Sequence, residues 1–320
     1  MGESIKKISD FGILPLLVLD DVNKAVPLAK ALAKGGIPVA EVTFRTDAAV
    51  DSIRAIAQQV PEVVVGAGTV HTVQQAKQAV EAGAQFIVTP GLIPDVIRWC
   101  VEQGVEIVPG VVSPADIEVA MGFGLEVCKF FPAEAYGGVK TLKALAGPYA
   151  SIRFVPTGGV SADNMLDYLS LPNVAAVGGS FVLPDELVNA QNWESISELC
   201  QSIIQKMLGF TLAHVGINTK DADDAHNVAH RLSQLFFQPV KEFPGAYFAG
   251  DLAEVIKGKY LGAMGHIGVN SRDIDRAVAY FNRIGVPFDT DSAVYNDKGK
   301  LAAIYFKEEI GGFAVHLRRQ

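Results

Sequence analysis

The stretch Glu126-Val127-Cys128-Lys129-Phe130-Phe131-Pro132-Ala133-Glu134 begins as an apolar strand pattern that reaches a lysine. A helical pattern over Val139–Ala146 follows it, and the next β-rich run covers Ile152–Val155. A strand, a helix and a second strand in this order make up a β/α unit, whose strands pair in parallel. The stretch therefore predicts an α/β fold and places Lys129 at the end of a strand, where a loop begins.

The same alternation extends in both directions, from about Phe11 to Leu208. Eight runs are predicted as strands: Ile13–Leu19, Val39–Phe44, Val63–Gly66, Phe86–Val88, Glu106–Val108, Glu126–Phe130, Ile152–Val155 and Val174–Val177. Helical patterns separate these runs, and a last helix over about Trp193–Met207 would complete the ring. Eight units in about 200 residues favour a (β/α)8 TIM barrel over an open doubly wound sheet. We therefore expect a barrel domain over residues 1–208.

Composition narrows the class of protein. Hydrophobic residues make up 49% of the chain and charged residues 19%, so a large core is available. The net charge of −8 and the lack of a Lys/Arg-rich run argue against nucleic-acid and membrane partners. We expect neither a transmembrane helix nor a signal peptide, because no long apolar run is present. Three scattered cysteines are typical of a reduced, cytoplasmic protein.

Lys129 carries the strongest chemical signal. Aromatic and aliphatic neighbours leave its amine poorly hydrated, and poor hydration disfavours the ammonium form of a lysine. A neutral amine is a nucleophile that forms Schiff bases with carbonyl compounds. The alternative interpretation is a strand-end lysine that reaches water or pairs with Glu134.

Other candidate residues follow from the rule that barrel chemistry lies where strands end and βα loops begin. Glu41, Thr43 and Arg45 alternate along the second strand and share one of its faces. A glutamate and an arginine there are either used by the site or form a structural ion pair with each other. Thr69 ends a glycine-rich segment after the third strand, and Pro90 follows the fourth.

The loops after the seventh and eighth strands are rich in glycine. They read Thr157-Gly158-Gly159-Val160-Ser161 and Gly178-Gly179-Ser180. Phosphate groups commonly bind to backbone N–H groups of these two loops, and glycine permits the close approach that such binding needs. One Gly-Gly pair can simply make a tight turn, but two pairs in the two expected loops predict a site for an anionic substrate tail.

Together these segments resemble one family. Glu41-Val42-Thr43-Phe44-Arg45-Thr46, Gly66-Ala67-Gly68-Thr69, Lys129-Phe130-Phe131-Pro132-Ala133-Glu134, Gly147-Pro148, Pro156-Thr157-Gly158-Gly159 and Gly178-Gly179-Ser180 are similar to the 2-keto-3-deoxy-6-phosphogluconate / 4-hydroxy-2-oxoglutarate aldolase family. The resemblance covers about residues 5–208. It implies a class I Schiff-base aldolase, a lyase that releases pyruvate from a 2-keto-4-hydroxy acid. It further implies a homotrimer without a metal or other cofactor, which serves carbohydrate metabolism in the Entner-Doudoroff pathway.

The resemblance also implies a role for each matching residue. Lys129 would be the Schiff-base lysine, Glu41 the general acid/base, and Arg45 the residue that holds the pyruvate carboxylate. The remaining substrate-binding residues would be Thr69, which orients the keto acid, the apolar wall of Pro90 and Phe131, and the phosphate cradle of Gly158, Gly159, Gly179 and Ser180, with Thr157 beside it.

The substrate stays open between two compounds. The glycine loops favour 2-keto-3-deoxy-6-phosphogluconate, which would give pyruvate and glyceraldehyde 3-phosphate. The alternative is 4-hydroxy-2-oxoglutarate, which would give pyruvate and glyoxylate, or else a related phosphorylated epimer. The expected partner is thus a small-molecule keto acid, most simply a phosphorylated one. A phosphosugar isomerase barrel is a different class, but it would not need a lysine that faces a glutamate. A non-enzymatic alternative is a ligand-sensing protein whose barrel no longer catalyses a reaction. The complete set of site residues argues against this alternative.

Residues 209–320 form a second predicted domain. The run Ala213-His214-Val215-Gly216-Ile217-Asn218 returns as Gly265-His266-Ile267-Gly268-Val269-Asn270, and acidic residues and a helical pattern follow each copy. The two histidines are 52 residues apart, and a fixed period of this size indicates a duplicated supersecondary unit. Each unit reads as a strand, a helix and two or three strands, which predicts a smaller α+β domain of βαβββ-like repeats.

This repeat resembles the vicinal-oxygen-chelate (glyoxalase-like) superfamily. The resemblance implies that positions for a divalent metal fall at His214, Glu254, His266 and His316, a reasonable donor set for a transition metal. His316 departs from the pattern, because the superfamily commonly has a carboxylate there. The favoured interpretation is therefore a domain for packing, oligomerisation or regulation, with a metal site as the alternative.

Overall fold

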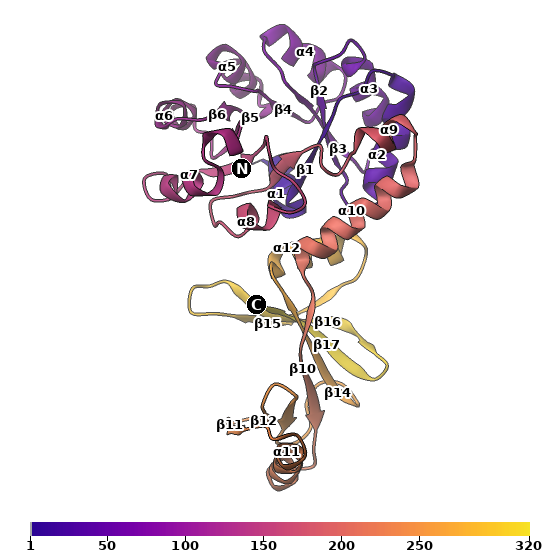
Figure 1. Ribbon diagram of the computed structural model, residues 1–320, viewed down its shortest axis with the longest axis vertical. Helices are drawn as coiled ribbons and strands as arrows, with labels where there is room; N and C mark the ends of the chain where they lie inside the picture. The colour runs from indigo at the N-terminus through magenta and orange to yellow at the C-terminus, as the bar shows by residue number, and fades with distance from the viewer. Residues whose placement is uncertain (1) are drawn as a thin grey trace. The chain divides into compact units, whose positions relative to one another are not determined.

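The computed structural model describes residues 2–320, and the chain divides into two compact units (Figure 1). Unit 1 extends to Ile204, and unit 2 comprises Gln205–Gln320. The division falls inside helix α10 (Trp193–Leu208), the helix after which the sequence predicts a domain boundary. Among the described residues, no helix combines the length and the apolar character needed to cross a bilayer.

The strands of unit 1 are short, mostly buried and paired in parallel. They are β1 (Ile13–Leu17), β2 (Val39–Thr43), β3 (Val64–Gly68), β4 (Phe86–Val88), β5 (Glu106–Val108), β6 (Gly110–Val111), β7 (Val127–Phe130), β8 (Arg153–Pro156) and β9 (Val177–Gly179). One sheet has the order β5-β4-β3-β2-β1-β9 and another the order β6-β7-β8. Only Pro109 separates β5 from β6, and a bridge between Thr157 and Gly178 links β8 to β9. The strand pairs thus form a closed circuit within an α/β fold.

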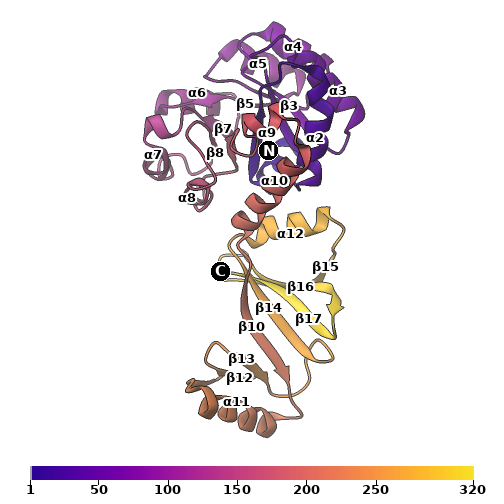
Figure 2. The same ribbon diagram turned by 45° about the vertical axis from the view of Figure 1, so that its right-hand side comes forward.

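The helices of unit 1 lie outside this circuit, as Figures 1 and 2 show. They are α1 (Glu3–Phe11), η1 (Val22–Lys24), α2 (Ala25–Lys34), α3 (Ala49–Gln59), α4 (Val73–Glu81), α5 (Pro94–Gln103), α6 (Pro114–Gly122), η2 (Glu134–Tyr136), α7 (Gly138–Leu145), α8 (Met165–Leu169) and α9 (Asp185–Asn189). Local sequence sets their ends. Ser113 and Asp116 form a capping box at the start of α6, and Gly104 ends α5 in the left-handed conformation.

Unit 1 departs from the sequence predictions most clearly at its last strand and at its first helix. The last strand is β9, Val177–Gly179, rather than Val174–Val177, and its two glycines pair with Leu14 and Pro15 of β1. Glycine has a low strand propensity, so the sequence pattern ends before Gly178 and Gly179. Pairing with β1 nevertheless holds these two residues in an extended strand. Helix α1 was not predicted at all.

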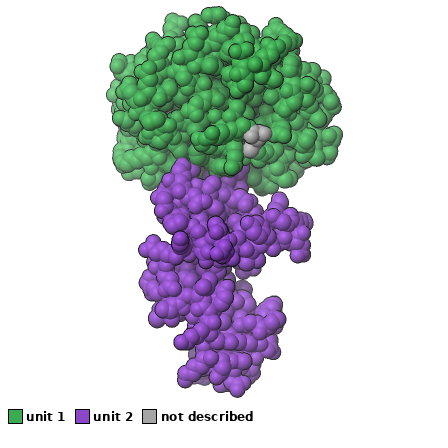
Figure 3. Space-filling model, turned by 180° about the vertical axis from the view of Figure 1, so that it is seen from behind, with its two compact units in different colours: residues 1–204 green, residues 205–320 purple. Residues whose placement is uncertain are grey.

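Unit 2 (purple in Figure 3) is built on one sheet. Its strands are β10 (Thr211–Asn218), β11 (Val240–Glu242), β12 (Ala246–Ala249), β13 (Ala253–Ile256), β14 (Gly265–Ser271), β15 (Phe288–Tyr295), β16 (Leu301–Ile310) and β17 (Phe313–Arg319). The order across the sheet is β11-β12-β13-β10-β14-β17-β16-β15. β10 and β14 meet antiparallel in the middle, and each pairs in parallel with the last strand of its own half.

One helix follows the first strand of each half of unit 2. These helices are α11 (Ala222–Phe236) and α12 (Ile274–Arg283), and Asp221 and Asp273 cap their N-termini in the same way. Figure 2 shows α11 against β12 and β13 and α12 at the other end of the sheet. Both halves thus run strand, helix, three strands.

Candidate active site

Lys129 and Glu41 meet in the interior of unit 1. Lys129 lies on β7 and Glu41 on β2, and the amine Nζ is 3.1 Å from the carboxylate Oε1. Only 5% of the lysine side chain and none of the glutamate side chain is exposed. Since alternate side chains of each strand point inside a closed circuit, distant strands can bring such residues together. The site therefore combines a buried amine with a buried acid.

Lys129 and Glu41 do not pair with the alternative partners that the sequence offered, Glu134 and Arg45. Glu134 does not pair with Lys129, because its Oε1 accepts a hydrogen bond from the Tyr168 hydroxyl. Burial raises the pKa of Tyr168, and the neighbouring Glu134 carboxylate raises it further, so the phenol stays a hydrogen-bond donor. Arg45 is exposed two residues beyond β2 and forms no ion pair with Glu41 among residues 2–320. Glu41 and Lys129 are thus partners of each other.

Gly68 makes room for the Glu41 side chain. Gly68 ends β3, the strand beside β2, and a Cβ there would lie 2.2 Å from Oε1 of Glu41 and 2.5 Å from its Cγ. The second carboxylate oxygen, Oε2, is buried and has no hydrogen-bond partner within the described residues. A buried carboxylate oxygen without a partner is a ready acceptor for a substrate group or for a transferred proton.

A cleft of about 330 Å³ opens at the ends of β4, β6 and β7. Pro90 and Phe131, the two residues expected to form an apolar wall, both line it. The Phe131 ring also lies 5.5 Å from the Lys129 amine. Tyr136 and Asp116 line the same cleft, although sequence reasoning had singled out neither. Their helices supply no local signal of this role, because the cleft forms only when three loops come together.

The two glycine-rich loops adjoin each other. Thr157 forms a bridge with Gly178, and the φ angles of Gly158 and Gly159 are 92° and 82°, which glycine adopts readily. Within the described part of the chain, the backbone N–H groups of Gly159 and Ser180 donate no hydrogen bond. Free N–H groups in a loop of this kind form a concavity that suits an anion.

Two further predictions concern single residues. Thr69 follows β3 directly, is partly buried and has a φ angle of 56°, an uncommon conformation for a threonine. Cys128 lies beside Lys129 but is fully buried, and burial raises the pKa of its thiol to about 12. A thiol in this state is a packing residue rather than a nucleophile.

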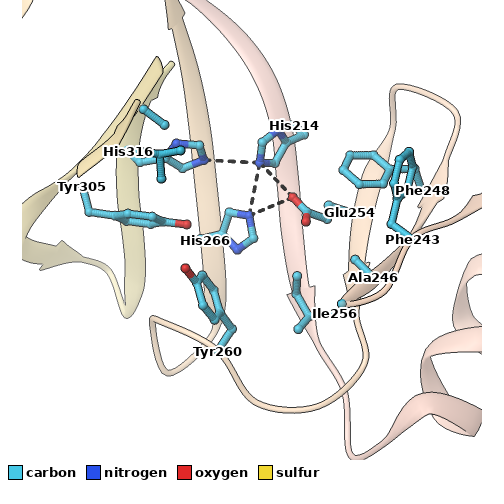
Figure 4. Close-up of a pocket in the computed structure, with 13 residues that line it drawn as sticks. His214, Phe243, Ala246, Phe248, Glu254, Ile256, Tyr260, His266, Tyr305 and His316 are labelled. Atoms are coloured by element: carbon cyan, nitrogen blue, oxygen red, sulfur yellow. Dashed lines mark hydrogen bonds and ion pairs between the residues drawn. The ribbon is translucent and has the colours of Figure 1, made fainter. Parts of the chain in front are cut away.

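The structure also gathers the four candidate residues of the second predicted domain. His214, His266 and His316 converge in unit 2, and Glu254 lies beside them (Figure 4). The superfamily resemblance implied these four positions individually, but only the strand pairing of the sheet shows that their side chains meet.

Comparison with known proteins links unit 1 to proteins of known activity. A family model described as KDPG and KHG aldolase matches residues 5–199. The chain is 44% identical over 200 residues to the 2-dehydro-3-deoxy-phosphogluconate aldolase of Haemophilus influenzae, covering 62% of this chain and 94% of that relative.

Two solved structures are similar to the same part of the chain. A KDPG aldolase from Legionella pneumophila, with pyruvate captured at low pH as a covalent carbinolamine intermediate, has a TM-score of 0.62 and 38% identity, covering 63% of this chain and 98% of that one. The 2-keto-3-deoxy-6-phosphogluconate aldolase of Zymomonas mobilis ZM4, with 3-phosphoglycerate, has a TM-score of 0.58 and 38% identity, covering 62% and 94%.

Proposed function

We propose that this chain, which belongs to the KDPG and KHG aldolase family, is a class I aldolase acting on 2-keto-3-deoxy-6-phosphogluconate. As a lyase it cleaves this compound to pyruvate and glyceraldehyde 3-phosphate through a lysine Schiff base. The observation that carries the proposal is the buried pair of Lys129 and Glu41, which supplies a nucleophilic amine and a proton carrier 3.1 Å apart.

The reaction begins with attack of the neutral Lys129 amine on the C2 carbonyl of the substrate. The product is a carbinolamine, and loss of its hydroxyl as water requires a proton. Glu41 delivers that proton, since its carboxyl group is within hydrogen-bond reach of the amine nitrogen. The result is an iminium ion, whose positive nitrogen can accept an electron pair from the carbon skeleton.

Cleavage of the C3–C4 bond follows from this electron demand. The C4 hydroxyl loses its proton, the C4 oxygen becomes the carbonyl of the departing aldehyde, and the bonding electrons form an enamine on the pyruvate half. Glu41 is the acceptor placed to take up the proton, because its Oε2 is otherwise unpartnered among the described residues. Protonation of the enamine at C3 and addition of water at C2 then release pyruvate and restore the amine.

The other predicted residues hold the substrate in this scheme. Arg45 binds the pyruvate carboxylate through its guanidinium, and Thr69 orients the keto acid. Pro90 and Phe131 form the apolar wall, and their shared cleft beside the Lys129 amine supports that role. An apolar wall excludes water, which strengthens electrostatic interactions inside the site.

The phosphate end of the substrate is assigned to the glycine loops. Gly158, Gly159, Gly179 and Ser180 form the cradle, with Thr157 beside it. The support is the adjacency of the two loops and the free N–H groups of Gly159 and Ser180. This cradle favours the phosphorylated substrate over 4-hydroxy-2-oxoglutarate.

The finer description of fold and assembly belongs to the same proposal. Unit 1 is a (β/α)8 barrel, for which the closed circuit of parallel pairs is the support, and unit 2 is a glyoxalase-like domain of two βαβββ repeats. The enzyme works as a homotrimer in the cytoplasm, in the Entner-Doudoroff pathway. Three buried, unpaired cysteines support a reducing compartment. Light scattering of the purified chain tests the trimer.

A coupled assay tests the activity. Pyruvate release is followed with lactate dehydrogenase and NADH, with 2-keto-3-deoxy-6-phosphogluconate and 4-hydroxy-2-oxoglutarate as separate substrates. The expected result is turnover of both, with the larger kcat/KM for the phosphorylated acid. A preference for 4-hydroxy-2-oxoglutarate would reassign the substrate and leave the aldolase chemistry intact. Release of no pyruvate from either substrate would overturn the proposal.

A further inference from the structure

Glu134 joins the loop that follows β7 to the first glycine-rich loop. The backbone N–H of Ala133 donates to the Thr157 carbonyl at 2.7 Å, and the N–H of Glu134 donates to the Gly158 carbonyl at 3.1 Å. The stem of the Glu134 side chain lies against Gly159, since a Cβ on Gly159 would overlap Cβ and Cγ of Glu134. The backbone thus carries a glutamate to the edge of the proposed phosphate cradle.

A carboxylate at this position conflicts with a phosphate ligand. Both groups are anions, and like charges a few ångströms apart repel each other in partly buried surroundings. The Glu134 side chain is exposed, so its carboxylate has space to rotate toward the N–H groups of Gly159 and Ser180, which donate no hydrogen bond within residues 2–320. There it would repel the phosphate group and compete with it for the same donors. An open cradle therefore requires a contact that turns the carboxylate away.

Tyr168 supplies that contact, because its hydroxyl donates a hydrogen bond to Oε1 of Glu134. Tyr168 lies on α8, the helix after this glycine-rich loop, and is fully buried, so packing fixes the position of the hydroxyl. Gly138 leaves the space that the two side chains need, since a Cβ there would lie 2.6 Å from the Tyr168 hydroxyl and 3.0 Å from Oε1 of Glu134. A fixed donor thus holds a carboxylate that could otherwise rotate.

The glycine-rich loop has other contacts that hold its shape. Nδ2 of Asn164 donates to the Gly159 carbonyl at 3.0 Å, and its Oδ1 accepts a hydrogen bond from the Ser161 N–H at 2.8 Å. The backbone hydrogen bonds from residues 133 and 134 hold the loop from its neighbour. The contact between Glu134 and Tyr168 is therefore available to orient a charge rather than to build the loop.

We propose that Tyr168 is a positioning residue that keeps the Glu134 carboxylate turned away from the phosphate cradle, so that the cradle accepts a phosphate monoester dianion. The inference rests on the proposed function, which gives the cradle its anionic ligand. Repulsion grows with the charge of the ligand, so binding of a substrate with phosphate depends on Tyr168 and binding of one without phosphate does not. Tyr168 is thereby a determinant of specificity for phosphorylated acids.

Binding of glycerol 3-phosphate tests the inference without turnover. This compound carries a phosphate monoester and has no keto group, so it cannot form a Schiff base with Lys129. Calorimetric titration of the full-length chain should show saturable binding, and Tyr168→Phe should weaken it about tenfold, since the released carboxylate repels the dianion. Glu134→Gln removes the charge and keeps a hydrogen-bond acceptor, so this variant should bind at least as tightly as the wild-type protein.

The double variant Tyr168→Phe/Glu134→Gln separates the effect of charge from that of structure. A neutral amide does not repel phosphate, so the second substitution should restore binding to within about threefold of the wild-type affinity. If the two side chains only supported the loop, the double variant would bind no better than Tyr168→Phe. That result, or wild-type affinity in folded Tyr168→Phe, would overturn the inference.

Tyr149→Phe is the matched control. Tyr149 is also a buried tyrosine of unit 1, and its hydroxyl donates to Oε1 of Glu118 at 3.2 Å. The control loses the same kind of hydrogen bond at another place, so it should bind glycerol 3-phosphate like the wild-type protein. A loss equal to that of Tyr168→Phe would reveal an unspecific effect and contradict the inference. Circular dichroism confirms that each variant is folded.

Kinetics extend the test to the substrates. In Tyr168→Phe, KM for 2-keto-3-deoxy-6-phosphogluconate should rise about tenfold and kcat should stay within about twofold, because Lys129 and Glu41 are untouched. Neither constant should change for 4-hydroxy-2-oxoglutarate, and the double variant should restore the KM of the phosphorylated acid. An equal effect on both substrates would indicate general damage and count against the inference.

The results distinguish the role of Tyr168 from the proposed function. If the wild-type chain released no pyruvate but the variants showed the expected pattern of glycerol 3-phosphate binding, the aldolase assignment would fail and the role of Tyr168 would stand. If the phosphorylated acid were turned over equally well by Tyr168→Phe, the role would fail and the assignment would stand. Absence of glycerol 3-phosphate binding by the wild-type chain would overturn the role of Tyr168 together with the cradle.

Discussion

The amine of Lys129 lies 3.1 Å from Oε1 of Glu41, although 88 positions separate the two residues in the chain. The contact is buried and joins β7 to β2 across the interior of unit 1. Neither residue pairs with the alternative partner that lies in its own stretch of sequence. Glu134 is bound to Tyr168, and Arg45 is exposed beyond the end of its strand.

Removal of the amine should abolish covalent chemistry. Lys129→Ala is expected to lose the pyruvyl adduct that borohydride traps, and to lower kcat more than about 10⁴-fold, as loss of a covalent nucleophile does. Intact-mass spectrometry measures the adduct. Lys143→Ala, which removes an exposed lysine of α7, serves as the matched control and should keep both adduct and turnover. A stoichiometric adduct in Lys129→Ala would place the reactive amine elsewhere.

Removal of the acid should separate binding from turnover. Glu41→Gln keeps the size of the side chain but cannot carry a proton, so kcat should fall about 10²–10⁴-fold. Pyruvate should still bind and be trapped, although more slowly, because the amine is intact. Steady-state kinetics and adduct formation on the same preparation check both points. Turnover close to that of the wild-type enzyme would remove Glu41 from the mechanism.

A methyl group on Gly68 should mimic the loss of Glu41. In Gly68→Ala the new Cβ overlaps the Glu41 carboxylate, which must move away from Lys129. We expect a fall in kcat of at least about tenfold with little loss of bound pyruvate, since proton transfer depends on that alignment. Gly122→Ala is the control, because nothing lies within 4 Å of the Cβ that this substitution would add. Equal kcat values for the two variants would mean that the displacement of Glu41 has no consequence.

The glycine loops should govern the choice of substrate. Gly159→Ala puts a side chain at a φ of 82° and within 2.4 Å of Glu134, which disturbs the loop. Loss of one charge-assisted hydrogen bond to phosphate lowers kcat/KM for 2-keto-3-deoxy-6-phosphogluconate about 10–100-fold. The value for 4-hydroxy-2-oxoglutarate, which has no phosphate, should change far less. An equal loss for both substrates would point to general damage rather than to a phosphate cradle.

The resemblance of unit 2 to the glyoxalase-like superfamily predicts a metal at His214, Glu254, His266 and His316, and Gly268→Ala tests that prediction. The new Cβ would lie 2.7 Å from Cε1 of His214 and 2.8 Å from Nε2 of His316, so both rings must shift. Co²⁺ affinity should fall at least about tenfold while the thermal midpoint of the metal-free chain changes little, because ring ends can move more easily than backbone. Calorimetry measures both. Unchanged Co²⁺ affinity would show that these ring positions do not matter for the metal.

Much of the chemistry could be predicted from the sequence alone. The lysine at the end of an apolar run, the alternation of strands and helices, and the paired glycine loops are local features, and local features are encoded within a few neighbouring residues. The family motifs are also short runs of neighbouring residues, so they too can be identified from the sequence. The repeat of His214 and His266 is equally visible, because duplication leaves a constant spacing.

Long-range pairing of strands determined which of these side chains come together. No local pattern distinguishes Glu134 from Glu41 as the neighbour of Lys129, because that choice depends on which strands close the circuit. The space that Gly68 leaves for a carboxylate, and that Gly216 and Gly268 leave for imidazole rings, exists only between facing strands. Strand register is a cooperative property of whole sheets, and a shift by one residue would turn each of these side chains to the opposite face. The sequence therefore identified the candidate residues, whereas only the tertiary structure decided which of them come into contact.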